Sequence, residues 1–232
     1  MHDYDDLRVV ILAAGLGSRL GGDLPKSLSL LSDGRTILQR QLDLFGSKFG
    51  AERLTIVVGY RKEQLIEAAP DATFVYNEAF ARTNTSQSLL RALVATLNAP
   101  TIWVNGDVVF EEGALDPLAA AVRAGRSAIG VTVGPTSSEE VKYLLADDGA
   151  VAELSKQVAD SPGEAIGLNF VGRAEKAALV RGLRACGPND YFERGIEHAI
   201  HDGARFVPLD LTGFSCIEVD FAADLELARS RY

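Results

Sequence analysis

The chain has 232 residues, of which 47% are apolar and 24% are charged, a balance that is ordinary for a folded globular protein. The formal net charge is −9 and no run of lysine or arginine occurs, whereas a nucleic-acid-binding protein normally carries a basic excess or stripe. No apolar stretch approaches the roughly 20 residues that cross a bilayer, so neither a nucleic-acid nor a membrane partner is expected.

The N-terminal stretch MHDYDDLRVV is acidic before its first apolar run, whereas a secretory signal begins with basic residues and has a longer apolar core. The two cysteines, Cys186 and Cys216, lack CxxC spacing and a nearby histidine cluster, so a zinc site is not expected. Together these features predict a cytoplasmic protein with reduced thiols.

Apolar runs alternate with amphipathic segments along the first half of the chain. Strands are predicted at 7–13, 54–60, 72–77 and 100–107, and helices at 36–48, 61–69, 85–97 and 112–125. Asn84 is a suitable cap for the helix that follows it, and Gly125 lies just past the end of the fourth helix. Such alternation is typical of a parallel sheet with right-handed crossovers.

The second half of the chain is mixed. Predicted elements are strands at 127–134 and 165–172, a hairpin at 141–156, helices at 175–186 and 191–203, short strands at 204–211 and 216–220, and a helix at 221–232. The hairpin turn is expected at Asp147-Asp148-Gly149. The sequence therefore predicts one α/β domain, a three-layer sandwich with a mixed, mostly parallel sheet and a small β-rich insertion.

A glycine-rich loop, GLGSRLGGDLPK at 15–26, follows the first predicted strand. Ligands of open parallel sheets bind at the carboxyl ends of the strands, and glycines let backbone N–H groups approach an anion. The dinucleotide fingerprint is excluded because Leu20 stands where its third glycine would be, and the kinase-type phosphate loop is excluded because G-x-x-x-x-G-K-[ST] is absent. The next predicted helix begins only near residue 36, so this long loop suits a triphosphate.

The loop resembles the signature G-x-G-x-R…P-K of the nucleotidyltransferases that make nucleoside-diphosphate-activated metabolites, and the resemblance extends over essentially the whole chain. It implies a Rossmann-like fold of the glycosyltransferase-A type, with a nucleotide-binding half at about 1–125 and an acceptor-binding half at about 126–232. By this resemblance Gly15 and Gly17 wrap the triphosphate, Arg19 contacts the departing β and γ phosphates, and Lys26 approaches the α phosphate.

Two aspartates follow apolar strands: Asp107 ends the run TIWVNGD, and Asp220 ends CIEVD. A triphosphate reaction needs Mg²⁺ held by oxygen ligands, although strand-end aspartates also serve as helix caps and turn formers. The family resemblance implies that Asp107 and Asp220 are the paired aspartates that hold Mg²⁺. His198 and His201 lie on one predicted helix without a third ligand, and we expect them on a solvated or partly packed face.

The polar segment 76–89, YNEAFARTNTSQSL, resembles the phosphocholine cytidylyltransferase branch, which also includes enzymes for inositol phosphate and aminoalkylphosphonates. The resemblance implies base contacts from Asn84 and Ser88 and from the backbone of Ala13 and Ala14; the alternative is a capped helix start. The loop between Arg19 and Lys26 is shorter than in the phosphocholine type and closer to the inositol-phosphate type. CTP is therefore the expected nucleotide, and the acceptor stays open.

Lys142 and Lys156 flank the predicted hairpin, and each is either a ligand of the acceptor phosphate or a surface lysine. Glu164, in the segment GEAIG, and the pair Tyr191 and Glu193 match family positions near the acceptor. A carboxylate beside an aromatic ring suits an ammonium group.

The leading hypothesis is therefore an Mg²⁺-dependent transferase that moves CMP from CTP, or another NTP, to a small phosphorylated or phosphonylated metabolite. The alternatives are a sugar-1-phosphate or molybdenum-cofactor nucleotidyltransferase that uses another NTP, and a non-catalytic nucleotide-sensing protein. A homodimer is compatible with the sequence, which does not report the oligomeric state or whether loop 134–140 acts as a lid.

Overall fold

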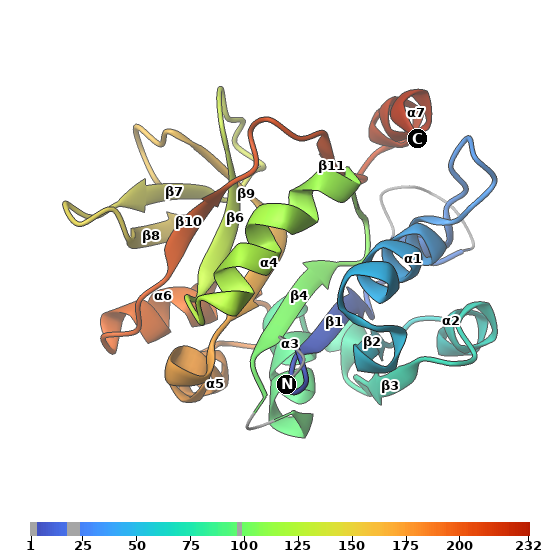
Figure 1. Cartoon of the computed structure of the whole chain (residues 1–232), viewed down its shortest axis with the longest axis horizontal. Coiled ribbons are helices and arrows are strands. Elements are labelled where there is room, and N and C mark those ends of the chain that lie inside the picture. Colours follow the sequence, from blue (N-terminus) through green and yellow to red (C-terminus); the bar gives the residue numbers. More distant parts are fainter. Residues whose placement is uncertain (1–3, 18–23, 97–98) are drawn as a thin grey trace.

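The computed structural model of the chain describes residues 4–17, 24–96 and 99–232. Within these residues, nine strands form one mixed sheet whose main path has the order β10-β6-β9-β4-β1-β2-β3 (Figure 1). β9 runs antiparallel to both neighbours, β4 and β6, and the other pairs of the main path are parallel. The predicted fold class, a mixed and mostly parallel sheet covered by helices, is confirmed.

The helices and strands occur in the predicted order, and most lie close to their predicted positions. The strands of the main path are β1 (Arg8–Ala13), β2 (Leu54–Val58), β3 (Thr73–Tyr76), β4 (Thr101–Asn105), β6 (Ala128–Val133), β9 (Gly163–Val171) and β10 (Val207–Asp210). The helices are α1 (Ile37–Phe49), α2 (Lys62–Ala68), α3 (Thr85–Ala95), α4 (Leu115–Arg123), α5 (Arg173–Ala185), α6 (Phe192–His201) and α7 (Ala222–Arg231). The β-rich insertion is the hairpin of β7 (Lys142–Leu145) and β8 (Val151–Ser155), which pairs with β9.

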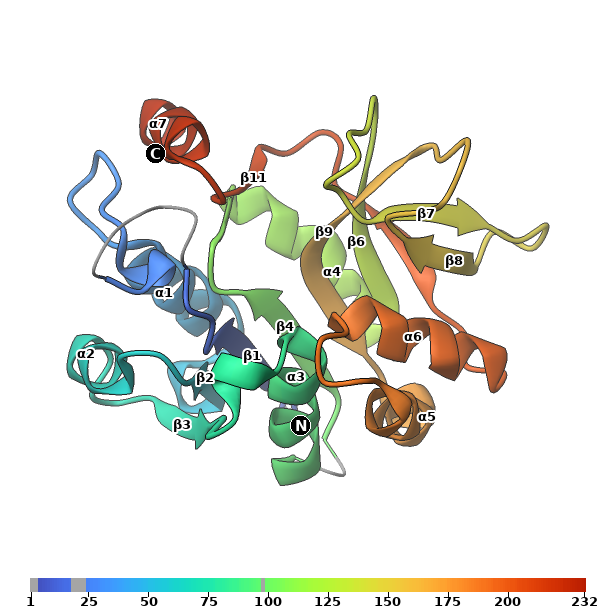
Figure 2. The same cartoon turned by 180° about the vertical axis from the view of Figure 1, so that it is seen from behind.

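Helices cover the two faces of the sheet in separate groups, α1 and α4 on the face seen in Figure 1 and α3, α5 and α6 on the face seen in Figure 2. The alternation of side chains along β1 explains this division, because Val9 and Ile11 pack into the core beneath α1, α2 and α4. Val10 and Leu12 instead join the core beneath α3, α5 and α6. A strand with apolar side chains on both faces is expected of a sheet that is buried on both sides.

The structure differs from the predicted elements mainly after β4. The strand predicted at 100–107 ends at Asn105, and a separate short strand, β5 (Val108–Phe110), follows the turn. β5 pairs with β11 (Cys216–Glu218) to form a two-stranded antiparallel sheet outside the main one. Three-residue strands show too little periodicity to be recognised in isolation.

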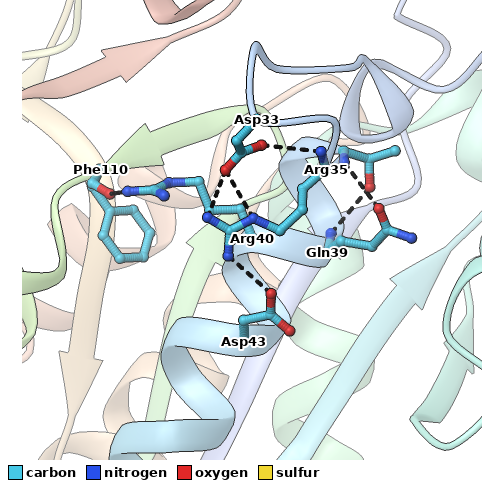
Figure 3. Close-up of polar contacts among 7 residues, drawn as sticks. Asp33, Arg35, Gln39, Arg40, Asp43 and Phe110 are labelled. Carbon is cyan, nitrogen blue, oxygen red and sulfur yellow. Dashed lines mark hydrogen bonds and ion pairs between the residues drawn. The ribbon is translucent and has the colours of Figure 1, made fainter. Parts of the chain in front are cut away.

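The N-terminus of α1 is fixed by side chains (Figure 3). The Thr36 hydroxyl accepts from the backbone N–H of Gln39 at 3.1 Å, and the Gln39 side chain accepts from the backbone N–H of Thr36 at 3.0 Å. This capping box satisfies two N–H groups that the helix leaves free. In the preceding loop, Arg35 pairs with Asp33 and Asp43. The start of α1 is therefore well defined, with the glycine loop before it.

Among the described residues, no helix combines the length and the apolar character that are needed to cross a membrane.

Candidate active site

The β5–β11 sheet brings the two strand-end aspartates together. Asp107 immediately precedes β5, and Asp220 lies two residues after β11. Because the strands are antiparallel and Val108 pairs with Glu218, both aspartates lie at the same end of the sheet. A further backbone bond, from Val219 N–H to the Asp107 carbonyl oxygen at 2.9 Å, extends the pairing between the two carboxylate-bearing residues.

Lys26 lies between these carboxylates. Its Nζ is 3.4 Å from Oδ2 of Asp107 and donates to Oδ1 of Asp220. Although burial by itself lowers the pKa of Lys26, the two carboxylates outweigh that effect and raise the pKa above its ordinary value. The side chain is therefore a cation that neutralises part of the charge of the pair.

Gly17 supports the position of Lys26. Its φ is +62°, a backbone conformation that residues other than glycine rarely adopt. A Cβ at this position would lie 2.9 Å from Cγ of Lys26. Pro25, which has φ −52°, immediately precedes the short 3₁₀ turn Lys26–Leu28. The glycine and the proline of the motif therefore both act on the placement of the lysine.

The aspartates and Lys26 lie in a cleft of about 630 Å³ at the carboxyl ends of β1 and β4. Eight acidic residues line its described part: Asp107, Glu139, Glu140, Glu164, Glu193, Glu218, Asp220 and Asp224. Lys26 and Lys156 are the lysines among the described lining residues. The described wall of the cleft is thus strongly acidic.

Of the residues that were predicted to contact the nucleotide, Ala13, Gly15, Gly17 and Asn84 line the cleft. Asn84 caps α3, because its Oδ1 accepts from the backbone N–H of Thr85 at 2.8 Å. Its Nδ2 also donates to the carbonyl oxygen of Asn189 at 3.3 Å, so the side chain joins the start of α3 to the segment before α6.

Of three further residues that were predicted to contact the nucleotide, two are not among the described lining residues of the cleft and one lies outside the described residues. The Ala14 carbonyl oxygen accepts from the backbone N–H of Tyr60 at 3.1 Å, and Ala14 is not among the described lining residues. Ser88 is buried and accepts from Nδ2 of Asn77 at 3.0 Å, away from the described cleft wall. Arg19 lies outside the described residues.

Of the residues that were predicted to contact the acceptor, Lys156, Glu164, Tyr191 and Glu193 line the cleft. Nζ of Lys156 lies 5.3 Å from the centroid of the Tyr191 ring and 3.8 Å from a carboxylate oxygen of Glu139. Lys142 is not among the described lining residues, because its Nζ reaches across the hairpin and donates to the carbonyl oxygen of Lys156 at 3.2 Å. Of the two hairpin lysines, Lys156 is the one that the structure brings to the cleft.

Glu193 is only 8% exposed, although it lines the cleft. Its Oε2 has no hydrogen-bond partner among the described residues. Burial raises the pKa of this carboxyl to about 7, with Lys156 acting in the opposite direction and Glu197 adding to the rise. The cleft therefore contains a buried carboxyl group that ionises near neutral pH.

Sequence reasoning did not assign Glu218 or Asp224 to the site, and both line the cleft. The Asp224 carboxylate accepts from the backbone N–H groups of Asp220 at 3.0 Å and of Phe221 at 2.7 Å. Both residues lie close to Asp220 in the stretch EVDFAAD, and this closeness is the signal in the sequence that could have indicated them. The pairing of β11 with β5 is what brings this stretch to the cleft. Loop 134–140 also contributes lining residues, so it forms part of one wall.

The donor set fits Mg²⁺. No group of three or more His, Cys, Asp or Glu side chains that could hold a metal occurs within the described part of the chain. Mg²⁺ in nucleotide enzymes is typically bound by one or two carboxylates, and substrate phosphates and water complete its ligands. Asp107 and Asp220 supply two carboxylates that already share one cationic neighbour, Lys26, so they are able to hold a cation together.

The comparisons with known proteins agree with this fold. Residues 9–177 match the family described as MobA-like NTP transferase domain. Because the match covers most of the chain, the chain belongs to this family.

Two curated relatives illustrate the similarity. The chain is 34% identical over 149 residues to CMP-5'-(3-aminopropyl)phosphonate synthase of Streptomyces rubellomurinus, covering 60% of this chain and 23% of that protein. It is 34% identical over 153 residues to the bifunctional protein GlmU of Cupriavidus taiwanensis, covering 65% of this chain and 33% of that protein. The chain thus spans only a quarter to a third of the length of these relatives.

Two solved structures share the fold over nearly the whole chain. CTP:phosphocholine cytidylyltransferase from Streptococcus pneumoniae has a TM-score of 0.77 at 22% identity and covers 97% of this chain and 99% of its own. The inositol-1-phosphate CTP transferase from T. maritima has a TM-score of 0.76 at 19% identity, with 95% and 94% coverage. At these identities the likeness is one of fold.

Proposed function

We propose that this chain is an Mg²⁺-dependent nucleotidyltransferase that moves CMP from CTP to the phosphate or phosphonate of a small metabolite and releases pyrophosphate. The observation that carries the proposal is the position of Lys26 against both Asp107 and Asp220, at the end of a glycine loop in one cleft. Phosphoryl-type transfer depends mainly on positioning and on positive charge near the phosphate oxygens, and this arrangement is suited to both.

In this proposal the backbone of the loop that contains Gly15 and Gly17 cradles the triphosphate. Arg19 approaches the β and γ phosphates, which depart as pyrophosphate. Lys26 stabilises the charge that develops on the α phosphate. Asp107 and Asp220 hold Mg²⁺, which when bound neutralises phosphate charge.

The reaction needs few groups from the protein. An oxygen of the acceptor phosphate or phosphonate attacks the α phosphorus, a new P–O bond forms, and the bond to the β phosphate breaks. The attacking oxygen is already ionised at neutral pH, so no general base is required. The residues of the chain therefore bind, orient and neutralise charge.

CTP is the proposed nucleotide, and Asn84 and the Ala13 backbone are the proposed base contacts, because both residues line the cleft. The names of three similar proteins, the phosphonate CMP synthase and the two solved transferases, refer to CTP or CMP, which supports this choice. Ser88 and Ala14 stay in the proposal only as indirect contributors, since they are not among the described lining residues.

For the acceptor, Lys156 is the proposed ligand of the phosphate or phosphonate, and Lys142 holds the Lys156 backbone from outside the cleft. Glu164, Tyr191 and Glu193 are the other proposed residues of the acceptor site, and the Tyr191 ring lies beside Lys156. A buried carboxylate next to an exposed aromatic ring favours an acceptor with an ammonium group, of the phosphocholine or aminoalkylphosphonate type, over an inositol phosphate.

We further propose that residues 1–232 act as a single nucleotidyltransferase domain. Strands from the nucleotide-binding half, about 1–125, and from the acceptor-binding half, about 126–232, share one sheet, which supports this view. A cytoplasmic location and the absence of nucleic-acid and membrane partners belong to the same proposal, and a homodimer is compatible with it.

The test is pyrophosphate release with each of the four common NTPs, Mg²⁺ and a panel of phosphocholine, aminoalkylphosphonates and inositol phosphate. We expect release with CTP and an ammonium-bearing acceptor, and its loss on chelation of the metal by EDTA. Release with another NTP alone would replace CTP in the proposal. Tight nucleotide binding without release for any pair would instead support a nucleotide-sensing protein.

A further inference from the structure

Gln41 is a polar residue on the buried face of α1. It is only 1% exposed, and the other buried residues of the helix are Ile37, Leu38, Phe45 and Phe49. Burying an amide costs free energy unless its polar atoms find hydrogen bonds, and an apolar residue would fill this position without that cost. The side chain of Gln41 therefore calls for an explanation in its contacts.

The amide of Gln41 donates to the turn that contains Asp107. Its Nε2 lies 3.0 Å from the carbonyl oxygen of Asn105 and 2.7 Å from that of Val108. These two carbonyl groups bracket Gly106 and Asp107. A single side chain thus holds both sides of the turn that links β4 to β5.

Backbone contacts hold the same turn from other directions. Gly106 donates its N–H to the carbonyl oxygen of Leu12 at 2.9 Å, and a Cβ at Gly106 would lie 2.8 Å from that oxygen. The Asp107 carbonyl oxygen accepts from Val219. Gln41 adds a third support, which comes from a separate element, the helix α1.

The neighbouring residue continues the connection of α1 to β5. Nη2 of Arg40 donates to the carbonyl oxygen of Phe110 at 3.2 Å (Figure 3). Arg40 and Gln41 therefore bind two backbone carbonyl groups of β5, those of Phe110 and Val108. Together these bonds set the position of β5, and with it Asp107, relative to α1.

We infer that Gln41 is a positioning residue that fixes the Asn105–Val108 turn so that the Asp107 carboxylate faces Lys26 and Asp220. The inference rests on the proposed function, because Asp107 is there assigned to hold the metal. Gln41 itself touches backbone atoms of the turn and not the substrate. Groups that orient metal ligands from behind typically affect metal affinity or activity by 10- to 100-fold when they are lost.

Two substitutions of Gln41 test this role. Gln41→Met keeps the length of the side chain and removes both donors, and Gln41→Glu keeps the shape but places a carboxylate against two carbonyl oxygens. The control is Phe49→Leu, which weakens the packing of the same helix at its far end, where Phe49 contacts Tyr4 and Phe45. Thermal unfolding identifies conditions at which control and variants are equally folded.

The two readouts are Mn²⁺ binding to the nucleotide-free protein, followed by electron paramagnetic resonance, and hydrogen exchange of the peptide that spans residues 105–110. We expect Gln41→Met to weaken Mn²⁺ binding by about tenfold or more and to speed exchange in that peptide. Gln41→Glu should do both more strongly, since its carboxylate oxygens accept hydrogen bonds only and would repel the two carbonyl oxygens that Gln41 contacts. Phe49→Leu should change neither relative to the wild-type protein.

Unchanged exchange in both Gln41 variants, or Mn²⁺ affinity equal to that of Phe49→Leu, would overturn the inference. If the wild-type protein binds no Mn²⁺ with or without CTP, the metal assignment of the proposed function fails. In that case the exchange of the 105–110 peptide alone decides whether Gln41 fixes the turn. The two failures are therefore distinguishable.

Discussion

Val219 donates its backbone N–H to the carbonyl oxygen of Asp107 at 2.9 Å, and this bond joins segments that are far apart in the sequence. It continues the pairing of β11 with β5 and leaves Asp107 and Asp220 close to the same ammonium group, that of Lys26. The carboxylate pair is therefore a product of backbone pairing outside the main sheet.

Asp220→Asn tests the assignment of this pair. The substitution keeps the shape of the side chain and removes one negative charge from the proposed metal site. We expect Mn²⁺ binding to weaken at least tenfold and CTP turnover to fall by about 100-fold. Asp202→Asn, at an exposed position 3.9 Å from Arg181, is the control and should leave both unchanged. Wild-type metal affinity in Asp220→Asn would remove Asp220 from the site.

Lys26→Met separates two roles of the lysine. Loss of a positive charge aimed at the α phosphate should lower turnover by about 100-fold or more. Because two carboxylates then lose their cationic neighbour, the nucleotide-free variant should also melt at a lower temperature, and Mg²⁺ should restore part of the difference. Scanning calorimetry with and without Mg²⁺ and a pyrophosphate assay measure the two effects.

The comparison variant for this test is Lys26→Arg, which keeps the charge but changes the geometry of the donors. It should recover more of the stability than of the turnover. If Lys26→Met melts like the wild-type protein and retains its activity, Lys26 neither compensates the carboxylates nor acts on the phosphate.

Glu193 predicts a pH dependence of stability. Burial raises its pKa from 4.5 to about 7 in the folded protein, so the folded state binds more protons than the unfolded state between these values. The contribution of Glu193 to stability is therefore fully present below about pH 4.5, falls as the pH rises to about 7, and is absent above that. The expected loss is about 3 kcal/mol at most.

Urea unfolding of the wild-type protein and of Glu193→Gln at several pH values from 5 to 8 measures this difference. The variant should gain stability relative to the wild-type protein as the pH rises, and Glu226→Gln, at an exposed position on α7, should not. In the acceptor assay, an ammonium group requires ionised Glu193, so the KM of such an acceptor should fall as the pH rises through about 7. Parallel pH profiles for all three proteins would contradict the prediction.

Lys176 predicts a large effect on stability away from the cleft. The side chain is buried, and its Nζ donates to the carbonyl oxygens of Thr96 and Ala99 and to the hydroxyls of Thr96 and Thr101. Lys176→Met removes one donor from each of these oxygens, although the Thr96 carbonyl oxygen still accepts from the backbone N–H of Ala99 and the Ala99 carbonyl oxygen from the Thr101 hydroxyl. We expect a loss of about 3 kcal/mol, or roughly 6–12 °C in melting temperature.

Lys48→Met is the matched control for Lys176. Lys48 pairs with Asp116 at the surface, where such an ion pair contributes little to the free energy of unfolding. The melting temperature of Lys48→Met should therefore differ from that of the wild-type protein by less than about 2 °C. The KM for CTP should be unaffected in both variants when they are measured well below their melting temperatures. Equal melting temperatures for the two variants would show that the buried ammonium does not stabilise the fold.

Much of the architecture could be predicted from the sequence, because strand and helix periodicity and turn chemistry are local properties. The runs that became β1, β2 and β4 are apolar at nearly every position. The helix predicted at 36–48 is α1, and α3 begins where Asn84 predicts it. The glycine loop was also recognisable, since the spacing of Gly15, Gly17 and Lys26 is a short-range pattern.

The tertiary structure alone decided which polar side chains face the cleft and which are already engaged. The Ser88 hydroxyl accepts a hydrogen bond from Asn77, and Lys142 donates to the backbone of Lys156, so neither side chain is available to the cleft. Glu193 is buried, and one of its oxygens has no hydrogen-bond partner among the described residues. Gln41 and the β5–β11 pairing went unpredicted because their partners are distant in the sequence. Hydrogen-bond partners and desolvation depend on groups that only the folded chain brings together, and no local pattern encodes them.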